Sequence, residues 1–449
     1  MIMLKRSPLR NRFGVSRYTH ALVKEKGVMT KIFIKDVRVF DSEVILNPGN
    51  VVFTRSAGNI QDPTADSSEA ETADHVVDGR GCSLLPGLID VYVNIKGANA
   101  ALGTFASYGI TTVLDMSSNT QQCQAMRVYA AGRTGLSTFL TSGTEAAPAQ
   151  GHQPHLYDNP DEYVIRTRAD AVAFVSSKVS GPDRSDFIKV VVGLHPVSDE
   201  LLKNIVDAAH AHGKLTIART AGRASYEHAM RAGFDIFAHA PLDAPIEPKL
   251  AREMAAQGKV FVPTLSMMRR HAPAAPSTDS TATSTGGQGQ GSRSARSNPT
   301  GFPSESRGGD GNSSADAESK QHSDPGATAG QNYGNATASV RTLHDAGVTI
   351  CAGTTANLIP GNQIPFGESL HEELRLLVDA GMSRLDVLRS ATCVAAKAFR
   401  LSDRGIVRGG LRADLVLVEG NPLEDIGVLR NIKKVWIQGE EVDPHIVAH

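Results

Sequence analysis

The feature that most limits the fold is an alternation of short apolar runs with stretches of helical spacing. Helical spacing of Leu, Ile, Val and Ala occurs, for example, in residues 198–212, where Ser198 provides a helix start. Strand and helix in alternation, eight times, predict an α/β fold, the TIM (β/α)8 barrel. A doubly wound open sheet is the alternative, although no Gly-rich dinucleotide turn supports it. The eight apolar runs have the length of buried strands and cover residues 84–91, 110–115, 136–141, 186–192, 214–218, 234–239, 259–264 and 348–352.

Two segments lack the apolar content of a folded unit. Residues 1–28 form a basic leader with seven Lys or Arg against one Glu, and we expect it to be a disordered tail. Residues from about 272 to 332 are rich in Ser, Gly, Thr and Asp, so they cannot bury enough surface to offset the entropy of ordering. We interpret them as a disordered insertion after the seventh strand, on the face where TIM barrels carry their active sites.

The charge balance excludes some functions. The net charge is −1 and the pI is near 7.0, so no overall field favours nucleic acid or a membrane surface. The four Cys are scattered without a C-x-x-C pair, which fits reduced thiols in an intracellular protein. We therefore expect a cytoplasmic protein, with a mitochondrial location as the alternative that the basic leader would favour.

Two motifs resemble the amidohydrolase superfamily, and within it the branch related to imidazolonepropionase and prolidase. The first is Leu-Leu-Pro-Gly-Leu-Ile-Asp at residues 84–90, and the second is G-x-x-x-x-G-x-x-A-D-L-V at residues 405–416. The resemblance implies a barrel paired with a small β-sandwich built from both chain ends. It divides the chain into the small β-domain, 29–82 and 403–449, and the barrel, 83–402.

The same resemblance implies one or two divalent metal ions at the carboxyl ends of the strands, held by His, carboxylate and a carbamylated Lys. Two positions keep the residue that the family uses: Lys189 in Asp-Phe-Ile-Lys and His239 in Phe-Ala-His-Ala-Pro. Four positions depart from it. Tyr92 and Asn94 replace the two His of the first strand, and Arg219 replaces the His of the fifth, although Arg has no lone pair to offer a metal. Thr355 replaces the Asp of the eighth strand, which would also act as general base.

These substitutions give three hypotheses about function. The first is an amidohydrolase-like protein without a metal cofactor that has lost metal-dependent hydrolysis, a pseudoenzyme or a protein that binds a small molecule or performs metal-free chemistry. Lys189 and His239 would be its catalytic residues, and Tyr92, Asn94, Arg219 and Thr355 would bind an anionic ligand. The second is an active hydrolase of C–N bonds in small amides or lactams, with one or two divalent ions, Zn²⁺ if any. The third is a scaffold that acts through the insertion.

The partner expected from the first hypothesis is a small molecule, with neither nucleic acid nor a membrane, and a homo-oligomer remains open. His152, His155 and His195 lie in loops on the active face, where solvated histidines are a simpler interpretation than a substitute ligand set.

The insertion gives a direct prediction about proteolysis. Limited trypsin digestion of the full chain should cut first between residues 272 and 332, because this segment lacks a core, and should leave the barrel fragments associated. Mass spectrometry of the first products gives the position of the cuts. Protection of this segment in the isolated protein, with first cuts elsewhere, would count against a disordered insertion.

Overall fold

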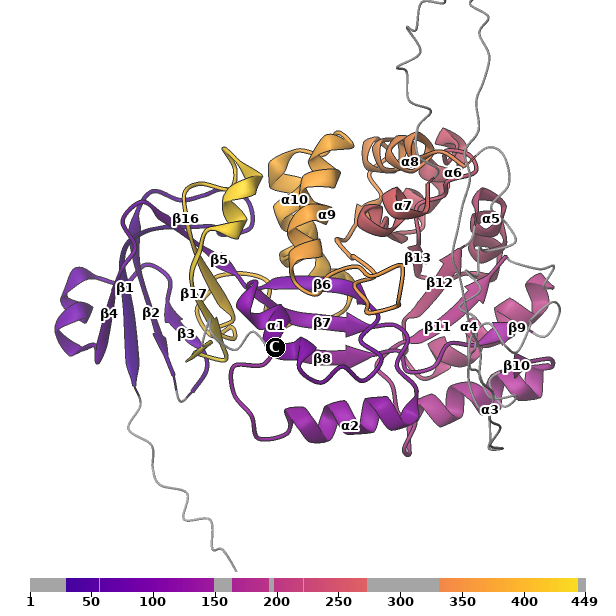
Figure 1. Cartoon of the computed structure of the whole chain (residues 1–449), viewed down its shortest axis with the longest axis horizontal. Coiled ribbons are helices and arrows are strands. Elements are labelled where there is room, and N and C mark those ends of the chain that lie inside the picture. Colours follow the sequence, from indigo (N-terminus) through magenta and orange to yellow (C-terminus); the bar gives the residue numbers. More distant parts are fainter. Residues whose placement is uncertain are drawn as a thin grey trace, which may run out of the picture.

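The computed structural model of the chain describes residues 30–55, 57–148, 164–193, 198–220, 222–272 and 331–442. The basic leader expected at residues 1–28, nearly all of the insertion, and His152, His155 and His195 lie outside the described residues. Figure 1 shows a strand barrel surrounded by helices and, beside it, a small β-domain in which the indigo start and the yellow end of the chain lie together. No helix in the described ranges is long and apolar enough to cross a membrane.

The barrel consists of two hydrogen-bonded rows of parallel strands, one of three strands and one of five. The rows meet where Ala146 bridges to Val190, and where the N–H of Val91 donates to the carbonyl of Ala352 at 3.1 Å. The predicted TIM (β/α)8 barrel is therefore confirmed, with every expected strand present. The first row is β6 (Leu88–Val93), β7 (Ile110–Asp115) and β8 (Thr138–Thr141), and the second is β11 (Ile188–Val192), β12 (Thr216–Thr220), β13 (Ile236–Ala238), β14 (Val260–Val262) and β15 (Thr349–Ile350).

Helices cover the outside of the barrel, and local sequence signals set their ends. Ser198 caps the fourth helix by accepting the N–H of Leu201 at 3.2 Å. The ninth ends in a Schellman motif, since Gly381 has φ 108° and the N–H of Met382 donates to the carbonyl of Leu377. The helices are α1 (Ala101–Ser107), α2 (Thr120–Ala130), α3 (Arg168–Val179), α4 (Asp199–Ala211), α5 (Arg223–Ala232), α6 (Pro248–Ala256), α7 (Leu265–His271), α8 (Tyr333–Asp345), α9 (Glu368–Asp379), α10 (Arg384–Ser390) and α11 (Cys393–Ala398), and a minor pair of strands is β9 (Ala147–Pro148) and β10 (Val164–Ile165).

Strands from both chain ends form the small β-domain. Their order is β18-β17-β16-β5-β1-β2-β3, and β4 pairs with the first part of β1, on the side that pairs with β5 further along. A core lies between the two halves, where Phe53 meets Trp436 edge to face at 5.3 Å between ring centroids, both fully buried. The strands are β1 (Lys31–Val39), β2 (Gly49–Thr54), β3 (Ile60–Asp62), β4 (His75–Asp78), β5 (Cys82–Pro86), β16 (Leu415–Glu419), β17 (Ile432–Ile437) and β18 (Glu440–Glu441), with 3-10 helices at Ser67–Thr72 and Ile426–Arg430.

The first predicted strand, 84–91, needs a correction because the chain divides it between the two domains. β5 pairs with β16 in the small β-domain, and β6 begins the barrel. Gly87 makes the transition: its N–H donates to the carbonyl of Asp414 at 2.8 Å, and a Cβ there would lie 2.1 Å from Oγ1 of Thr111. The periodicity of a continuous apolar run does not reveal such a change of sheet.

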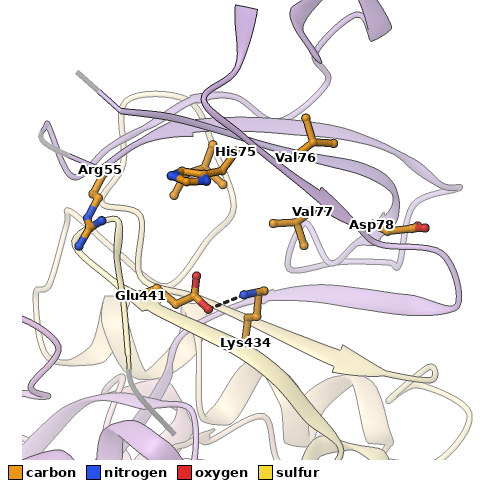
Figure 2. A pocket seen from close by; sticks show the side chains of 8 residues that line it. Arg55, His75, Val76, Val77, Asp78, Lys434 and Glu441 are labelled. Atoms are coloured by element: carbon orange, nitrogen blue, oxygen red, sulfur yellow. Dashed lines mark hydrogen bonds and ion pairs between the residues drawn. The ribbon is translucent and has the colours of Figure 1, made fainter. Parts of the chain in front are cut away.

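The small β-domain also holds a cavity of about 500 Å³ between β4 and the β17–β18 hairpin. Its charged side chains already have partners, since Lys434 pairs with Glu441 and Arg55 with Glu440. Figure 2 shows Lys434 and Glu441 facing each other on one side and His75, Val76 and Val77 on the other. No residue of this cavity is among the predicted site residues, which all belong to the barrel.

Candidate active site

The structure brings the predicted site residues to the carboxyl-terminal side of the barrel strands. The ring centroids of Tyr92 and His239 are 4.9 Å apart, and Nζ of Lys189 lies 5.1 Å from the Tyr92 ring centroid. The N–H of Thr355 donates to the carbonyl of Tyr92 at 2.7 Å. Asn94 follows β6 and is fixed by its N–H, which donates to Ala356. Four segments distant in the sequence therefore meet around Tyr92: β6, β11, the end of β13 and the turn after β15.

Glu145 is the site residue that the sequence analysis missed. One carboxylate oxygen, Oε2, lies 2.8 Å from Nζ of Lys189, and the other, Oε1, lies 3.8 Å from Nη1 of Arg219. Nζ of Lys189 also donates to the carbonyl of Met116 at 2.7 Å. The only available signal was a single acidic residue among small ones, Thr-Ser-Gly-Thr-Glu-Ala-Ala, directly after the third barrel strand.

The Glu145–Lys189 pair is charged at neutral pH. Burial alone would raise the pKa of Glu145, but the nearby Lys189 and Arg219 outweigh it and hold this pKa below its ordinary value. Burial alone would lower the pKa of Lys189, but Glu145 outweighs it and raises this pKa. Among the described residues, the Glu145 carboxylate therefore lies against two cations, Lys189 and Arg219.

His239 is neutral in this environment. Burial holds the pKa of its imidazole well below the ordinary value, and repulsion by Arg219 and Lys189 acts in the same direction. Its Nδ1 lies 2.7 Å from the hydroxyl oxygen of Thr264. A neutral imidazole offers one N–H donor and one lone pair, so His239 can accept a hydrogen bond beside the cations Lys189 and Arg219.

Three buried polar atoms at the site have no hydrogen-bond partner among the described residues. They are the hydroxyl of Tyr92, the hydroxyl of Thr355 and Oδ1 of Asn94. Leaving such atoms unpaired costs about 1–3 kcal/mol each, so proteins rarely tolerate several together without a ligand or water. Their grouping around Tyr92 indicates a polar binding site at the carboxyl end of the barrel.

Asp90 forms hydrogen bonds with the two segments that carry Tyr92 and Thr355. Its carboxylate accepts the hydroxyl of Thr354 at 2.7 Å and the N–H groups of Tyr92 and Thr354 at 3.2 Å. Burial raises the pKa of Asp90 to about 7, although these hydrogen bonds oppose the shift. The carboxyl group thus joins β6 to the turn after β15, and it fixes the segments that carry Tyr92 and Thr355.

The possible donors among the described residues do not fit a divalent metal ion. Lys189 is held as an ammonium between Glu145 and Met116, and a carbamate at Nζ would place a second anion against the Glu145 carboxylate. Arg219 has no lone pair and repels a cation at short range. In the described ranges, no group of three His, Cys, Asp or Glu side chains lies close enough together to hold a metal.

The barrel, the composite β-domain and the polar residues at the carboxyl ends of the strands define a two-domain TIM-barrel protein with a polar candidate site. The family described as "Amidohydrolase family" matches residues 83–442, and the chain belongs to it.

Two solved structures are similar over 92% of this chain, both with a TM-score of 0.69. One is a Xaa-Pro dipeptidase with bound methionine, 21% identical, of which 99% is covered, and the other is a putative prolidase from Bifidobacterium longum, 20% identical, of which 95% is covered. At this level of identity the likeness shows the fold. Adenine deaminase 1 of Rhizobium meliloti (strain 1021) is 42% identical over 60 residues, 13% of this chain, so the chain matches only 11% of that relative's length.

The ion pair predicts unequal effects of removing its two members. Glu145→Gln leaves Lys189 and Arg219 without their counter-charge, and we expect it to lower the free energy of unfolding by about 3–5 kcal/mol. Lys189→Met should cost less, because Glu145 keeps Arg219 at 3.8 Å. Urea denaturation followed by circular dichroism at pH 7 measures both, with Glu253→Gln on the surface of α6 as the control. Equal losses in Glu145→Gln and Glu253→Gln would contradict a buried pair.

The same pair sets the direction of the pH dependence. Folding lowers the pKa of Glu145, so its contribution is present above the unfolded value of about 4.3 and is lost as the pH falls through the folded value. Unfolding measured from pH 7 down to pH 3 should therefore show a smaller acid-dependent loss in Glu145→Gln than in the wild type.

Proposed function

We propose that this protein is a metal-independent member of the amidohydrolase family whose barrel binds a small anionic molecule and has lost metal-dependent hydrolysis. The observation that carries the proposal is the Lys189–Glu145 contact of 2.8 Å. The Lys189 ammonium group thus lies against the Glu145 carboxylate and donates to the carbonyl of Met116. The Lys at this position is then a fixed cation rather than a precursor of an anionic ligand to metal.

Charge and hydrogen bonding support an anionic ligand. Lys189 and Arg219 place two cationic groups beside Glu145, and an anionic ligand would be attracted to both of them. The Arg219 side chain is 33% exposed, so it is not sealed in the core as Lys189 is. The unpartnered hydroxyls of Tyr92 and Thr355 can donate to the oxygens of such a ligand.

An active hydrolase of C–N bonds is the second candidate. The names of similar proteins, among them prolidases and an adenine deaminase, favour it. In this chain, such chemistry would depend on the neutral His239 and the hydroxyl of Tyr92, because Thr355 replaces the Asp that the family uses as general base on strand eight. For either candidate we propose a small-molecule partner and a cytoplasmic location.

Metal content separates these two candidates. The purified full-length protein should hold well below one equivalent of zinc, manganese or iron by emission spectrometry, and a chelator should leave its melting temperature unchanged. The combined variant Tyr92→His, Asn94→His, Arg219→His, Thr355→Asp restores the family's donors and should gain metal. Stoichiometric metal in the wild type that is lost in His239→Gln would overturn the proposal.

Ligand binding tests the positive charge of the pocket. Small carboxylates should raise the melting temperature of the full chain more than their neutral amides do. Arg219→Gln should weaken carboxylate binding roughly 10- to 100-fold, because a charge-assisted hydrogen bond contributes about 1.5–3 kcal/mol. Arg223→Gln, at the exposed start of α5, is the control. Equal binding of acids and amides, or no effect of Arg219→Gln, would argue against an anionic ligand.

A further inference from the structure

Thr264 orients the imidazole of His239 through a two-step hydrogen-bond chain. The hydroxyl oxygen of Thr264 lies 2.7 Å from Nδ1 of His239 and also 2.7 Å from the carbonyl of Pro263. A carbonyl only accepts hydrogen bonds, so the Thr264 hydroxyl donates to Pro263. That hydroxyl then has only its lone pairs left for His239, and Nδ1 must be the donor. A neutral imidazole with its proton on Nδ1 leaves the Nε2 lone pair available.

The rest of the histidine's surroundings agree with this arrangement. Nε2 of His239 has no hydrogen-bond partner among the described residues, and the ring stands edge to face against Tyr92. Its backbone carbonyl is also held, because it accepts the hydroxyls of Tyr226 and, at 3.4 Å, of Thr220. The ring is thus fixed at one nitrogen and at its backbone, while the other nitrogen remains unpaired.

Thr264 itself adopts a backbone conformation that requires support. Its φ of 51° and ψ of 46° lie in the left-handed region, which costs a β-branched residue of the order of 1–3 kcal/mol. Glu373 supplies the support from α9. Its carboxylate accepts the N–H of Leu265 at 2.8 Å, the N–H of Ser266 at 2.7 Å and the Ser266 hydroxyl at 2.8 Å.

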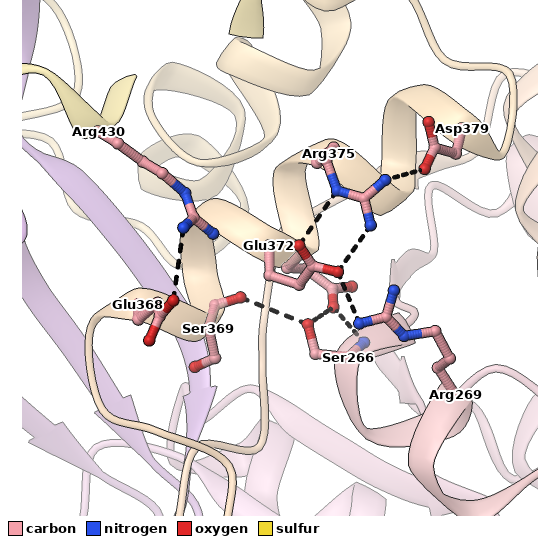
Figure 3. Close-up of polar contacts among 9 residues, drawn as sticks. Ser266, Arg269, Glu368, Ser369, Glu372, Arg375, Asp379 and Arg430 are labelled. Carbon is pink, nitrogen blue, oxygen red and sulfur yellow. Dashed lines mark hydrogen bonds and ion pairs between the residues drawn. The ribbon is translucent and has the colours of Figure 1, made fainter. Parts of the chain in front are cut away.

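Glu373 is fully buried, and its role differs from that of the adjacent Glu372. Figure 3 shows Glu372 between Arg375 and Arg269, and Ser266 beside Ser369. The Glu372 side chain is 22% exposed. Glu373 has no ion-pair partner in the described part of the chain, and its acceptor capacity is spent on the start of α7. A buried carboxylate without a counter-cation is costly, so it indicates a requirement at this position.

We propose that Glu373 and Thr264 are positioning residues that hold His239 as its neutral Nδ1–H tautomer, so that Nε2 accepts a hydrogen bond from an N–H or O–H group of the ligand. The ligand part rests on the proposed function, whereas the tautomer does not. The two sides of the site would then bind different groups of the ligand. Lys189 and Arg219 would bind its anionic or hydrogen-bond-accepting end, and Nε2 of His239 would bind a hydrogen-bond donor.

Nitrogen-15 NMR of the full chain tests the tautomer without any ligand. The protein, which has 15 histidines, is labelled with nitrogen-15 at its histidines. The signals of His239 are identified as the ones that are missing from the spectrum of His239→Gln. Measured at pH 8 after chelator treatment, Nδ1 should have the shift of a protonated nitrogen and Nε2 that of an unprotonated one. A wild-type His239 with its proton on Nε2 would overturn the proposal, whatever the outcome of the metal and ligand experiments.

Variants test the two positioning residues. Thr264→Val has the same branched shape and the same backbone strain but no hydroxyl, so the tautomer should shift toward Nε2–H, and Thr264→Ser should restore it. Glu373→Gln should shift it in the same direction to a smaller extent. Glu372→Gln, one residue earlier on α9, should leave it unchanged. An unchanged tautomer in folded Thr264→Val would refute the role of Thr264, and equal spectra of Glu372→Gln and Glu373→Gln would refute that of Glu373.

Discussion

The contact between Lys189 and Glu145 decides what the barrel can do. It joins strand β11 to the segment after β8, across the place where the two hydrogen-bonded rows of strands meet. A buried pair of this kind gains little over apolar packing, but each member is costly to leave alone. Arg219, His239 and Tyr92 are arranged around it. The proposal of a metal-independent site rests on this contact.

The fold was largely predictable from the sequence, because eight apolar runs each correspond to a barrel strand. The error at residues 84–91 has a physical cause: an apolar run looks the same whether it stays in one sheet or changes sheet at Gly87. The replacement of the family's metal-binding residues could be recognised from the sequence, because motifs fix the positions concerned. These positions hold Tyr92, Asn94, Arg219 and Thr355. The roles of Glu145, Thr264 and Glu373 could not be predicted from the sequence. Each depends on a tertiary contact with a residue at least 25 positions away.

The side chains on the two sides of the candidate site are held by different interactions. On one side, charge fixes Lys189 and Arg219 against Glu145. On the other, neutral hydrogen bonds and a strained backbone fix His239 through Thr264. Ionic strength weakens accessible charge pairs more than buried neutral hydrogen bonds. Salt should therefore affect recognition of the anionic end of a ligand more than recognition of its donor end.

The change of sheet at Gly87 has a consequence for dividing this chain into fragments. The part that matches the family begins at residue 83, inside β5, and omits β1 to β4. A fragment with that boundary would keep Trp436 but lose Phe53, and it would expose the side of β5 that pairs with Arg38 and Val39. An uncovered apolar face beside an unpaired strand edge favours aggregation. The solubility of the barrel thus depends on some fifty residues that lie before it in the sequence.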